Sequence, residues 1–165
     1  MAAPLRPRDR RRARGFTLIE MVVVVALVGI LAGAAWPLLQ LSVRRAQEYE
    51  LRHALRALRG AIDAYKQAGA EGRIAVEADA SGYPPNLQVL VDGAPAARGP
   101  VGARIYFLRR MPRDPFADRG LDAARTWALR SYESPPDAPR EGRDVFDVHS
   151  RSELAALDGT RYSDW

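Results

Sequence analysis

The feature that most constrains this chain is an apolar run of 23 residues without a charge, residues 21–43, in a chain of 165 residues. About 20 apolar residues are enough for a helix to cross the hydrocarbon core of a membrane. The residues that follow the run are enough for one modest globular domain. The sequence therefore predicts a membrane helix joined to a small domain.

The charge excess of the protein lies in the segment before this run. Residues 1–15 contain six arginines and one aspartate, a net charge of +5 that equals the formal net charge of the whole chain. Basic residues on this side favour a cytoplasmic N-terminus and an outward-facing C-terminal part. Because the rest of the chain is neutral overall, no basic face for nucleic acid is indicated. A removable signal peptide is the alternative, but its apolar centre is normally only about 7 to 15 residues long.

Glu20 carries a carboxylate into the start of the apolar segment. A charged side chain at the centre of a membrane helix costs about 2.5 to 3.5 kcal/mol on insertion scales, so this carboxylate needs a partner or a function. The simpler alternative is a side chain that reaches back to the membrane interface near the helix start.

The stretch GFTLIEMVVVVALVGILA resembles the prepilin-type N-terminus shared by type IV pilins and the pseudopilins of type II secretion. The resemblance rests on the basic leader, on Gly15 followed by Phe16, and on Glu20 four residues later. It implies that a prepilin peptidase in the inner membrane cuts between Gly15 and Phe16. It also implies methylation of the new amine, which makes Phe16 an N-methylphenylalanine.

Cleavage at that bond would give Glu20 a partner. The new α-amino group has an ordinary pKa of about 8 and is cationic. The amine of Phe16 lies about one helical turn from Glu20 within the chain, at 1.5 Å per residue. The amine of a neighbouring subunit could reach the same carboxylate, and buried opposite charges suit each other better than either suits lipid. We therefore expect Glu20 to be an assembly residue.

Two further features of the apolar run indicate helix assembly. Gly29 and Gly33 form a G-x-x-x-G pair, which lets helix backbones approach closely in membranes. Pro37 cannot donate a hydrogen bond to the carbonyl of Gly33 and should kink or loosen the helix. Filament subunits of the resembled family often carry a proline there, but an ordinary kinked anchor fits the sequence equally well.

An amphipathic helix continues after the run, so that one helix is expected from about residue 18 to residue 67. Its apolar stripe recurs at intervals of four and three residues, at Leu51, Leu55, Leu58, Ile62 and Tyr65. Charged residues occupy the other faces, where Glu48 with Arg52 and Arg59 with Asp63 have the i, i+4 spacing of stabilising pairs.

The remaining residues predict a small antiparallel sheet. Three short segments rich in aromatic or branched residues, 104–108, 125–132 and 144–149, are separated by proline-rich connections. A helical turn is expected at 85–91. The Tyr83-Pro84 pair and the segment MPRDPF, which ends at Phe116, resemble features of major pseudopilins. An α+β fold is expected, pilin-like, with the long N-terminal helix packed on a sheet of about three strands.

The expected organisation has four parts. They are a cleaved cytoplasmic leader, a transmembrane and polymerisation helix, an amphipathic continuation of that helix, and a periplasmic globular region. Their bounds are 1–15, 16–43, 44–68 and 69–165.

The C-terminal tail is the candidate metal site. No cofactor is required, but the resemblance to major pseudopilins implies a structural calcium ion, for which Asp158 and Asp164 are the candidate side-chain ligands. Calcium takes six to eight oxygen ligands. This tail has fewer acidic residues than those of major pseudopilins and lacks their glycine-rich acidic run. A plain turn at LDGT, with Trp165 as an apolar plug, is the alternative.

The function implied by the resemblance is that of a structural subunit of the periplasmic pseudopilus of type II secretion. Its expected partners are the prepilin peptidase, identical subunits, minor pseudopilins and the inner-membrane assembly platform. A type IV pilus subunit or minor pilin is the alternative, although a chain without cysteine cannot form the C-terminal disulfide common in major type IV pilins. Two isolated histidines without a cysteine offer no catalytic constellation, so no enzyme is expected.

Overall fold

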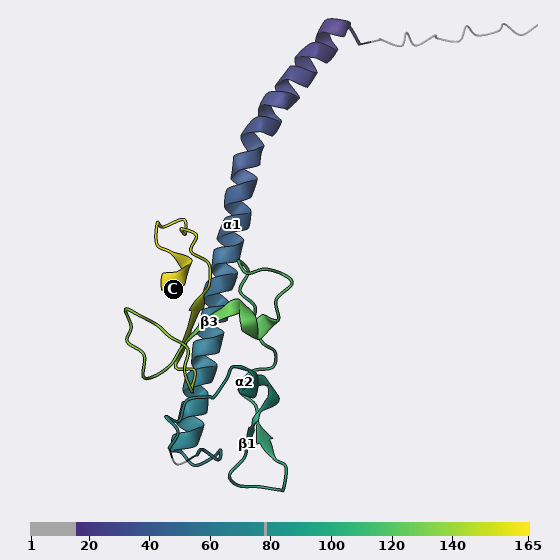
Figure 1. Ribbon diagram of the computed structural model, residues 1–165. Coiled ribbons are helices and arrows are strands. Elements are labelled where there is room, and N and C mark those ends of the chain that lie inside the picture. The colour runs from purple at the N-terminus through teal and green to yellow at the C-terminus, as the bar shows by residue number, and fades with distance from the viewer. Residues whose placement is uncertain (1–15, 78) are drawn as a thin grey trace, which may run out of the picture. The chain divides into compact units, whose positions relative to one another are not determined.

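The computed structural model describes residues 16–77 and 79–165, and it leaves out the side chains at positions 34, 35 and 38. The predicted leader, 1–15, lies outside the described residues. The chain divides into two compact units, Met1–Ser42 and Val43–Trp165. Helix α1, Leu18–Ala70, begins in the first unit and ends in the second (Figure 1). The α+β class is confirmed, and the expected helix ends three residues later than predicted.

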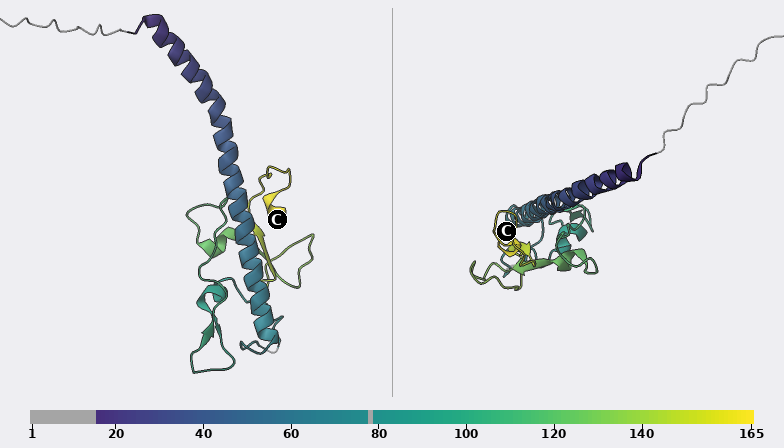
Figure 2. Two further views of the ribbon diagram at one scale, coloured as in Figure 1. Left: turned by 180° about the vertical axis from the view of Figure 1, so that it is seen from behind. Right: turned by 90° about the horizontal axis from the view of Figure 1, so that it is seen from above.

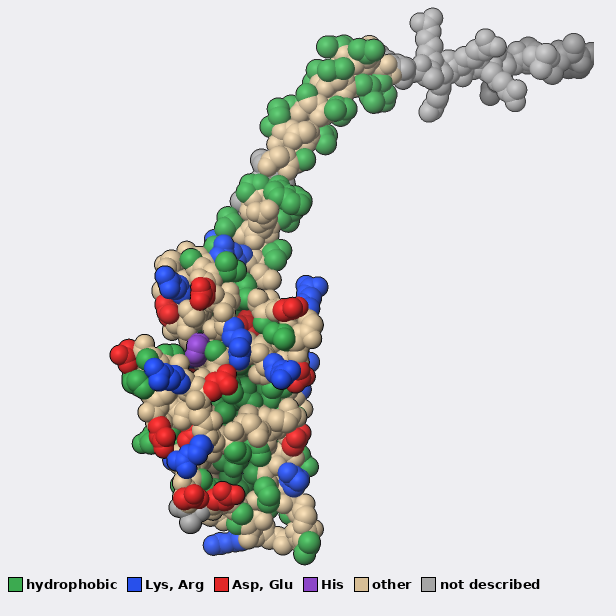
Figure 3. All heavy atoms as spheres, in the orientation of Figure 1, with side chains coloured by type: hydrophobic (Ala, Val, Ile, Leu, Met, Phe, Trp, Pro, Cys, Tyr) green, Lys and Arg blue, Asp and Glu red, His purple; other side chains and the backbone are tan. Residues whose placement is uncertain are grey.

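The first unit exposes its apolar side chains. From Phe16 to Leu41, the large apolar side chains that the structure describes are between 43% and 82% exposed. On the face seen in Figure 3, apolar side chains follow the first unit, and charged side chains gather on the second. Apolar surface of this extent normally marks contact with a membrane or with another protein.

The described residues were also assessed for membrane spans. Within that part of the chain, no helix combines the length and the apolar character needed to cross a membrane. The predicted span, 21–43, contains the three positions whose side chains are left out, so it lies partly outside the described residues. The span stays a prediction.

The core of the second unit forms on the apolar stripe of α1. All five predicted stripe residues, Leu51, Leu55, Leu58, Ile62 and Tyr65, are at most 7% exposed, which confirms the helical spacing. Burial of each such side chain contributes about 1.5 to 3 kcal/mol. The C-terminal strands and tail supply Trp127, Val148 and Tyr162 to the same core. Figures 1 and 2 show these segments beside the C-terminal half of α1.

The expected single sheet of about three strands is wrong, because the strands form two separate antiparallel pairs. Strand β1, Ala94–Pro95, pairs with β2, Arg104–Ile105. Strand β3, Trp127–Arg130, pairs with β4, Asp147–Ser150, with Trp127 opposite Ser150. All three predicted strand segments therefore contain strand, but the first pairs with a partner that the sequence did not indicate.

The hydrogen bonds after β2 explain this difference. The backbone N–H groups of Phe107 and Leu108 both donate to the carbonyl of Leu90, at 3.0 and 2.9 Å. They are thereby directed to helix α2, Gln88–Asp92, and cannot extend the β1–β2 ladder. The predicted helical turn is confirmed, with α2 lying slightly later than 85–91. The side-chain oxygen of Asn86 accepts a hydrogen bond from the N–H of Val89 at 3.0 Å. It thereby satisfies a free N–H donor in the first turn of α2.

A buried polar network attaches the MPRDPF segment to the β3–β4 pair. Asp114 is 1% exposed and accepts from the hydroxyl of Ser150 at 2.6 Å and from the N–H of Phe116 at 2.8 Å. The indole N–H of Trp127 donates to the carbonyl of Pro112 at 3.0 Å. A 3-10 turn, Ala123–Thr126, leads directly into β3. The two prolines of this segment thus lie in a connection whose polar groups are satisfied by the strands.

Candidate assembly site and the C-terminal tail

Helix α1 begins with a side-chain cap. The N–H of Glu20 donates to the hydroxyl oxygen of Thr17 at 3.3 Å. Thr17 directly precedes the helix and Glu20 is its third residue, the spacing of a capping box. Our sequence reasoning missed Thr17, although the T-x-x-E pattern within GFTLIE would have indicated it.

The cap leaves the carboxylate of Glu20 available. Glu20 is exposed, and none of the ion pairs among the described residues includes it. A negative charge in a first helical turn interacts favourably with the helix dipole, by about 0.3 to 1 kcal/mol. That interaction does not neutralise the charge. Gly15 lies outside the described residues, so the cleavage site stays a prediction.

Gly29 and Gly33 are not required by contacts within the chain. A Cβ atom added at either position would meet no heavy atom within 4 Å. Each glycine costs about 0.8 to 1.0 kcal/mol relative to alanine in a helix interior. The helical assignment also runs through Pro37. These three predicted assembly residues therefore lie on α1 without a partner in the described structure that accounts for them.

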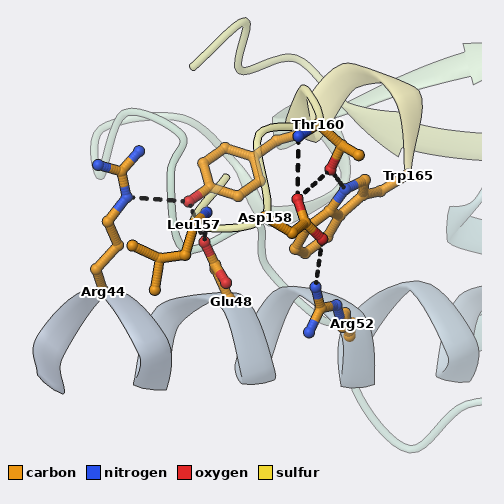
Figure 4. Close-up of polar contacts among 8 residues, drawn as sticks. Arg44, Glu48, Arg52, Leu157, Asp158, Thr160 and Trp165 are labelled. Atoms are coloured by element: carbon orange, nitrogen blue, oxygen red, sulfur yellow. Dashed lines mark hydrogen bonds and ion pairs between the residues drawn. The ribbon is translucent and has the colours of Figure 1, made fainter. Parts of the chain in front are cut away.

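A second polar site lies where α1 meets the C-terminal tail, defined here as residues 151–165 (Figure 4). Glu48 is only 6% exposed, and its Oε1 accepts from the hydroxyl of Tyr162 at 2.9 Å and from the N–H of Leu157 at 2.7 Å. One turn earlier, Arg44 donates to the same hydroxyl at 3.3 Å and to the carbonyl of Ala155. A buried carboxylate is thus satisfied by donors from the tail.

Arg52 lies one turn further along α1 and contacts two points of the tail. Its guanidinium forms an ion pair with Asp158 at 3.3 Å and lies 4.1 Å from the ring centroid of Trp165. Asp158 also accepts from the N–H and the hydroxyl of Thr160, at 3.0 and 2.6 Å. These Thr160 hydrogen bonds, followed by the charge of Arg52, hold the pKa of Asp158 below its usual value.

Arg59 completes this row of contacts. It donates to the carboxylate of Asp147 at 2.8 Å, to the carbonyl of Val148 at 3.0 Å, and to a backbone oxygen of Trp165 at 2.7 Å. Helix, strand β4 and tail therefore meet at one guanidinium.

These contacts correct the predicted charge pairs of α1. Among the described residues, neither Glu48 with Arg52 nor Arg59 with Asp63 forms an ion pair. Three of these four side chains contact the tail or β4. The i, i+4 spacing indicates only that two charges can meet along a helix, and a more distant partner in the tail competes with that pair.

The tail residues do not fit a calcium site in this arrangement. Throughout the described residues, no three histidine, cysteine, aspartate or glutamate side chains lie close enough together to hold a metal ion. Asp158 faces a guanidinium, which repels a divalent cation. The carboxylate of Asp164 accepts from the adjacent Ser163 hydroxyl, at 3.4 Å. Since calcium takes six to eight oxygen ligands, these two aspartates would leave most of its coordination to backbone carbonyls and water.

Comparison with known proteins agrees with the N-terminal features. The family described as the prokaryotic N-terminal methylation motif matches residues 10–36. The type II secretion system core protein G of Klebsiella pneumoniae is 37% identical over 113 residues, which cover 64% of this chain and 71% of that protein. The protein of the same name from Aeromonas hydrophila is 32% identical over 114 residues, or 67% of this chain and 72% of that protein.

A pilus protein is similar over a shorter length. The type IV major fimbrial protein FimA of Dichelobacter nodosus is 40% identical over 60 residues, which cover 36% of this chain and 38% of that protein. The comparison with solved structures gave no significant match.

Proposed function

The chain belongs to the family of the type II secretion system core protein G, and we propose that it polymerises through its N-terminal helix into the pseudopilus of such a system. The observation that carries this proposal is the exposed N-terminal half of α1, where every large apolar side chain that the structure describes up to Leu41 is at least 43% exposed. In a filament, the same halves of neighbouring subunits would cover this surface. The second unit already buries its own core and would lie outside the helical bundle.

The assembly residues follow from this arrangement. Gly29 and Gly33 offer a surface where a neighbouring helix can approach closely, and nothing within the chain occupies it. Pro37, one turn later, lacks the N–H that would tie it to Gly33, so the helix can extend there when subunits pack. The carboxylate of Glu20 is neutralised by the amine of Phe16 from a neighbouring subunit, which sets the axial register.

The proposed pseudopilus function also determines how the chain is processed and where it lies in the cell. A prepilin peptidase removes residues 1–15 and methylates Phe16. Before assembly, residues 21–43 anchor the subunit in the inner membrane, with the N-terminus in the cytoplasm and residues 69–165 in the periplasm. The assembly platform in that membrane and the minor pseudopilins are the further partners. The role is structural, and no reaction is assigned to the chain.

The type IV pilus is the second candidate, since FimA shares similarity with this chain. That similarity covers 36% of the chain, whereas the Aeromonas hydrophila secretion protein matches 67% of it. A match of that length must extend beyond α1, which ends at Ala70, into the residues that follow the helix. It therefore favours secretion.

Deletion of the gene tests this assignment in the source organism. We expect at least a tenfold loss of proteins secreted to the medium, with their accumulation in the periplasm, while pilus-dependent motility stays normal. Expression of the intact chain from a plasmid should restore secretion. Normal secretion together with lost motility would instead assign the chain to a type IV pilus.

A further inference from the structure

The C-terminal tail has little regular structure to hold it in place. Its backbone pairing consists of one isolated bridge, Ala155 with Arg161, and a 3-10 turn, Tyr162–Asp164. Only Ala156 and Tyr162 of the tail are buried. A segment with so few buried apolar contacts opens readily unless other interactions hold it. The polar contacts with α1 therefore add to the burial of Tyr162 in keeping the tail docked.

Arg52 is the side chain of α1 that contacts both Asp158 and Trp165 of this tail. Its contacts with Asp158 and Trp165 lie on the two sides of Thr160, whose hydroxyl accepts from the indole N–H of Trp165 at 2.7 Å. The same hydroxyl donates to Asp158. The loop from residue 158 to residue 165 is thus closed by Thr160, and Arg52 attaches both Asp158 and Trp165 to the helix (Figure 4).

Both carboxylate oxygens of Asp158 are engaged in this arrangement. Oδ1 accepts the two hydrogen bonds from Thr160, and Oδ2 faces the guanidinium of Arg52 at 3.3 Å. A metal ion at Asp158 would have to bind beside the guanidinium of Arg52 and so approach a fixed positive charge. Arginine remains protonated at all physiological pH values, so this charge is permanent.

We propose that the guanidinium of Arg52 takes the place of a metal ion in the tail, so that the folded second unit requires no calcium. The arginine supplies the cation that neutralises Asp158, and its planar face also packs on Trp165, which a calcium ion would not do. The proposal concerns the stability of the second unit and does not depend on the secretion role.

The first test measures thermal unfolding of the full chain in detergent, followed by tryptophan fluorescence. We expect the same melting temperature, within about 1 °C, in millimolar calcium chloride and in excess EDTA. A bound metal would raise the melting temperature by mass action. A rise of several degrees with calcium, or a fall with EDTA, would overturn the proposal.

The second test replaces Arg52 by glutamine. An exposed ion pair and an exposed cation–π contact each make a small contribution to stability. We expect the melting temperature to fall by about 3 to 6 °C. Hydrogen exchange at the amide of Thr160, which donates to Asp158, should also accelerate several-fold.

The matched control is Arg56→Gln, one turn away on α1. Arg56 is exposed and takes part in none of the side-chain hydrogen bonds or ion pairs of the described residues. This variant should have the same melting temperature as the unmodified chain and the same slow hydrogen exchange at the amide of Thr160. If Arg52→Gln behaved like Arg56→Gln in both measurements, Arg52 would not hold the tail and the proposal would fail.

Discussion

Replacement of Glu20 by alanine is expected to abolish homopolymer formation and to leave membrane insertion and leader cleavage intact. The carboxylate is exposed at the start of α1, and the cap from Thr17 uses only the backbone N–H of Glu20. Without the carboxylate, each mature subunit would bring a cationic amine into an apolar helix bundle with no counter-charge. An unpaired charge in such surroundings costs several kcal/mol, enough to prevent assembly. Filament yield in sheared fractions measures this effect.

Two further variants distinguish the pairing of the Glu20 carboxylate with the amine of Phe16 from the capping of the helix by Thr17. Glu20→Asp keeps the charge on a shorter side chain and should retain part of the filament yield. Thr17→Val removes the cap, which costs about 0.5 to 2 kcal/mol of local helix stability, but leaves the carboxylate. It should therefore assemble far better than Glu20→Ala. Normal filaments from Glu20→Ala would refute the pairing, and equal losses from Thr17→Val would assign the effect to the cap.

Replacement of Trp127 by alanine should cause the largest loss of stability in the second unit. The side chain is fully buried and packs in the core with the stripe of α1. Truncation of a buried tryptophan costs about 3 to 5 kcal/mol, because apolar contacts are lost and a cavity remains. The carbonyl of Pro112 also loses its donor. We expect a fall in melting temperature of about 10 °C or more, with loss of subunit accumulation in cells.

Trp127→Phe should cost less, because it keeps most of the apolar contact and loses the hydrogen bond. Tyr49→Ala is the matched exposed control, since Tyr49 is 69% exposed on α1. Its effect should stay within about 0.5 kcal/mol. A cost for Trp127→Ala no larger than that of Tyr49→Ala would mean that the core is not centred on Trp127.

The helix and its buried face could be predicted from the sequence because their signals are local. The spacing of Leu51, Leu55 and Leu58 follows the helical repeat, and all three are buried. The pairing of β1 with β2 could not be predicted. The β1 segment is rich in alanine and proline, which do not indicate a strand. Its pairing with β2 depends on the carbonyl of Leu90, which accepts hydrogen bonds from the N–H groups of residues 107 and 108.

The tail contacts were missed for a different reason. Arg52 lies 106 residues before Asp158, and a charge on a helix surface gives no sequence signal of such a distant partner. The regular spacing of Glu48 and Arg52 instead favoured a local pair. The candidate calcium ligands came from a resemblance, and the arginine that faces Asp158 belongs to another element. Local spacing therefore predicted helix α1 and its buried face well and the tail poorly.

The central claim is that the mature chain polymerises through a helix that begins at Phe16. The most direct measurement is the intact mass of subunits in filaments sheared from cells that produce this chain together with a type II secretion apparatus. The account predicts filaments whose subunit starts at Phe16 and carries one added methyl group. Subunits that retain the arginine-rich leader, or a chain that stays monomeric beside a working apparatus, would contradict it.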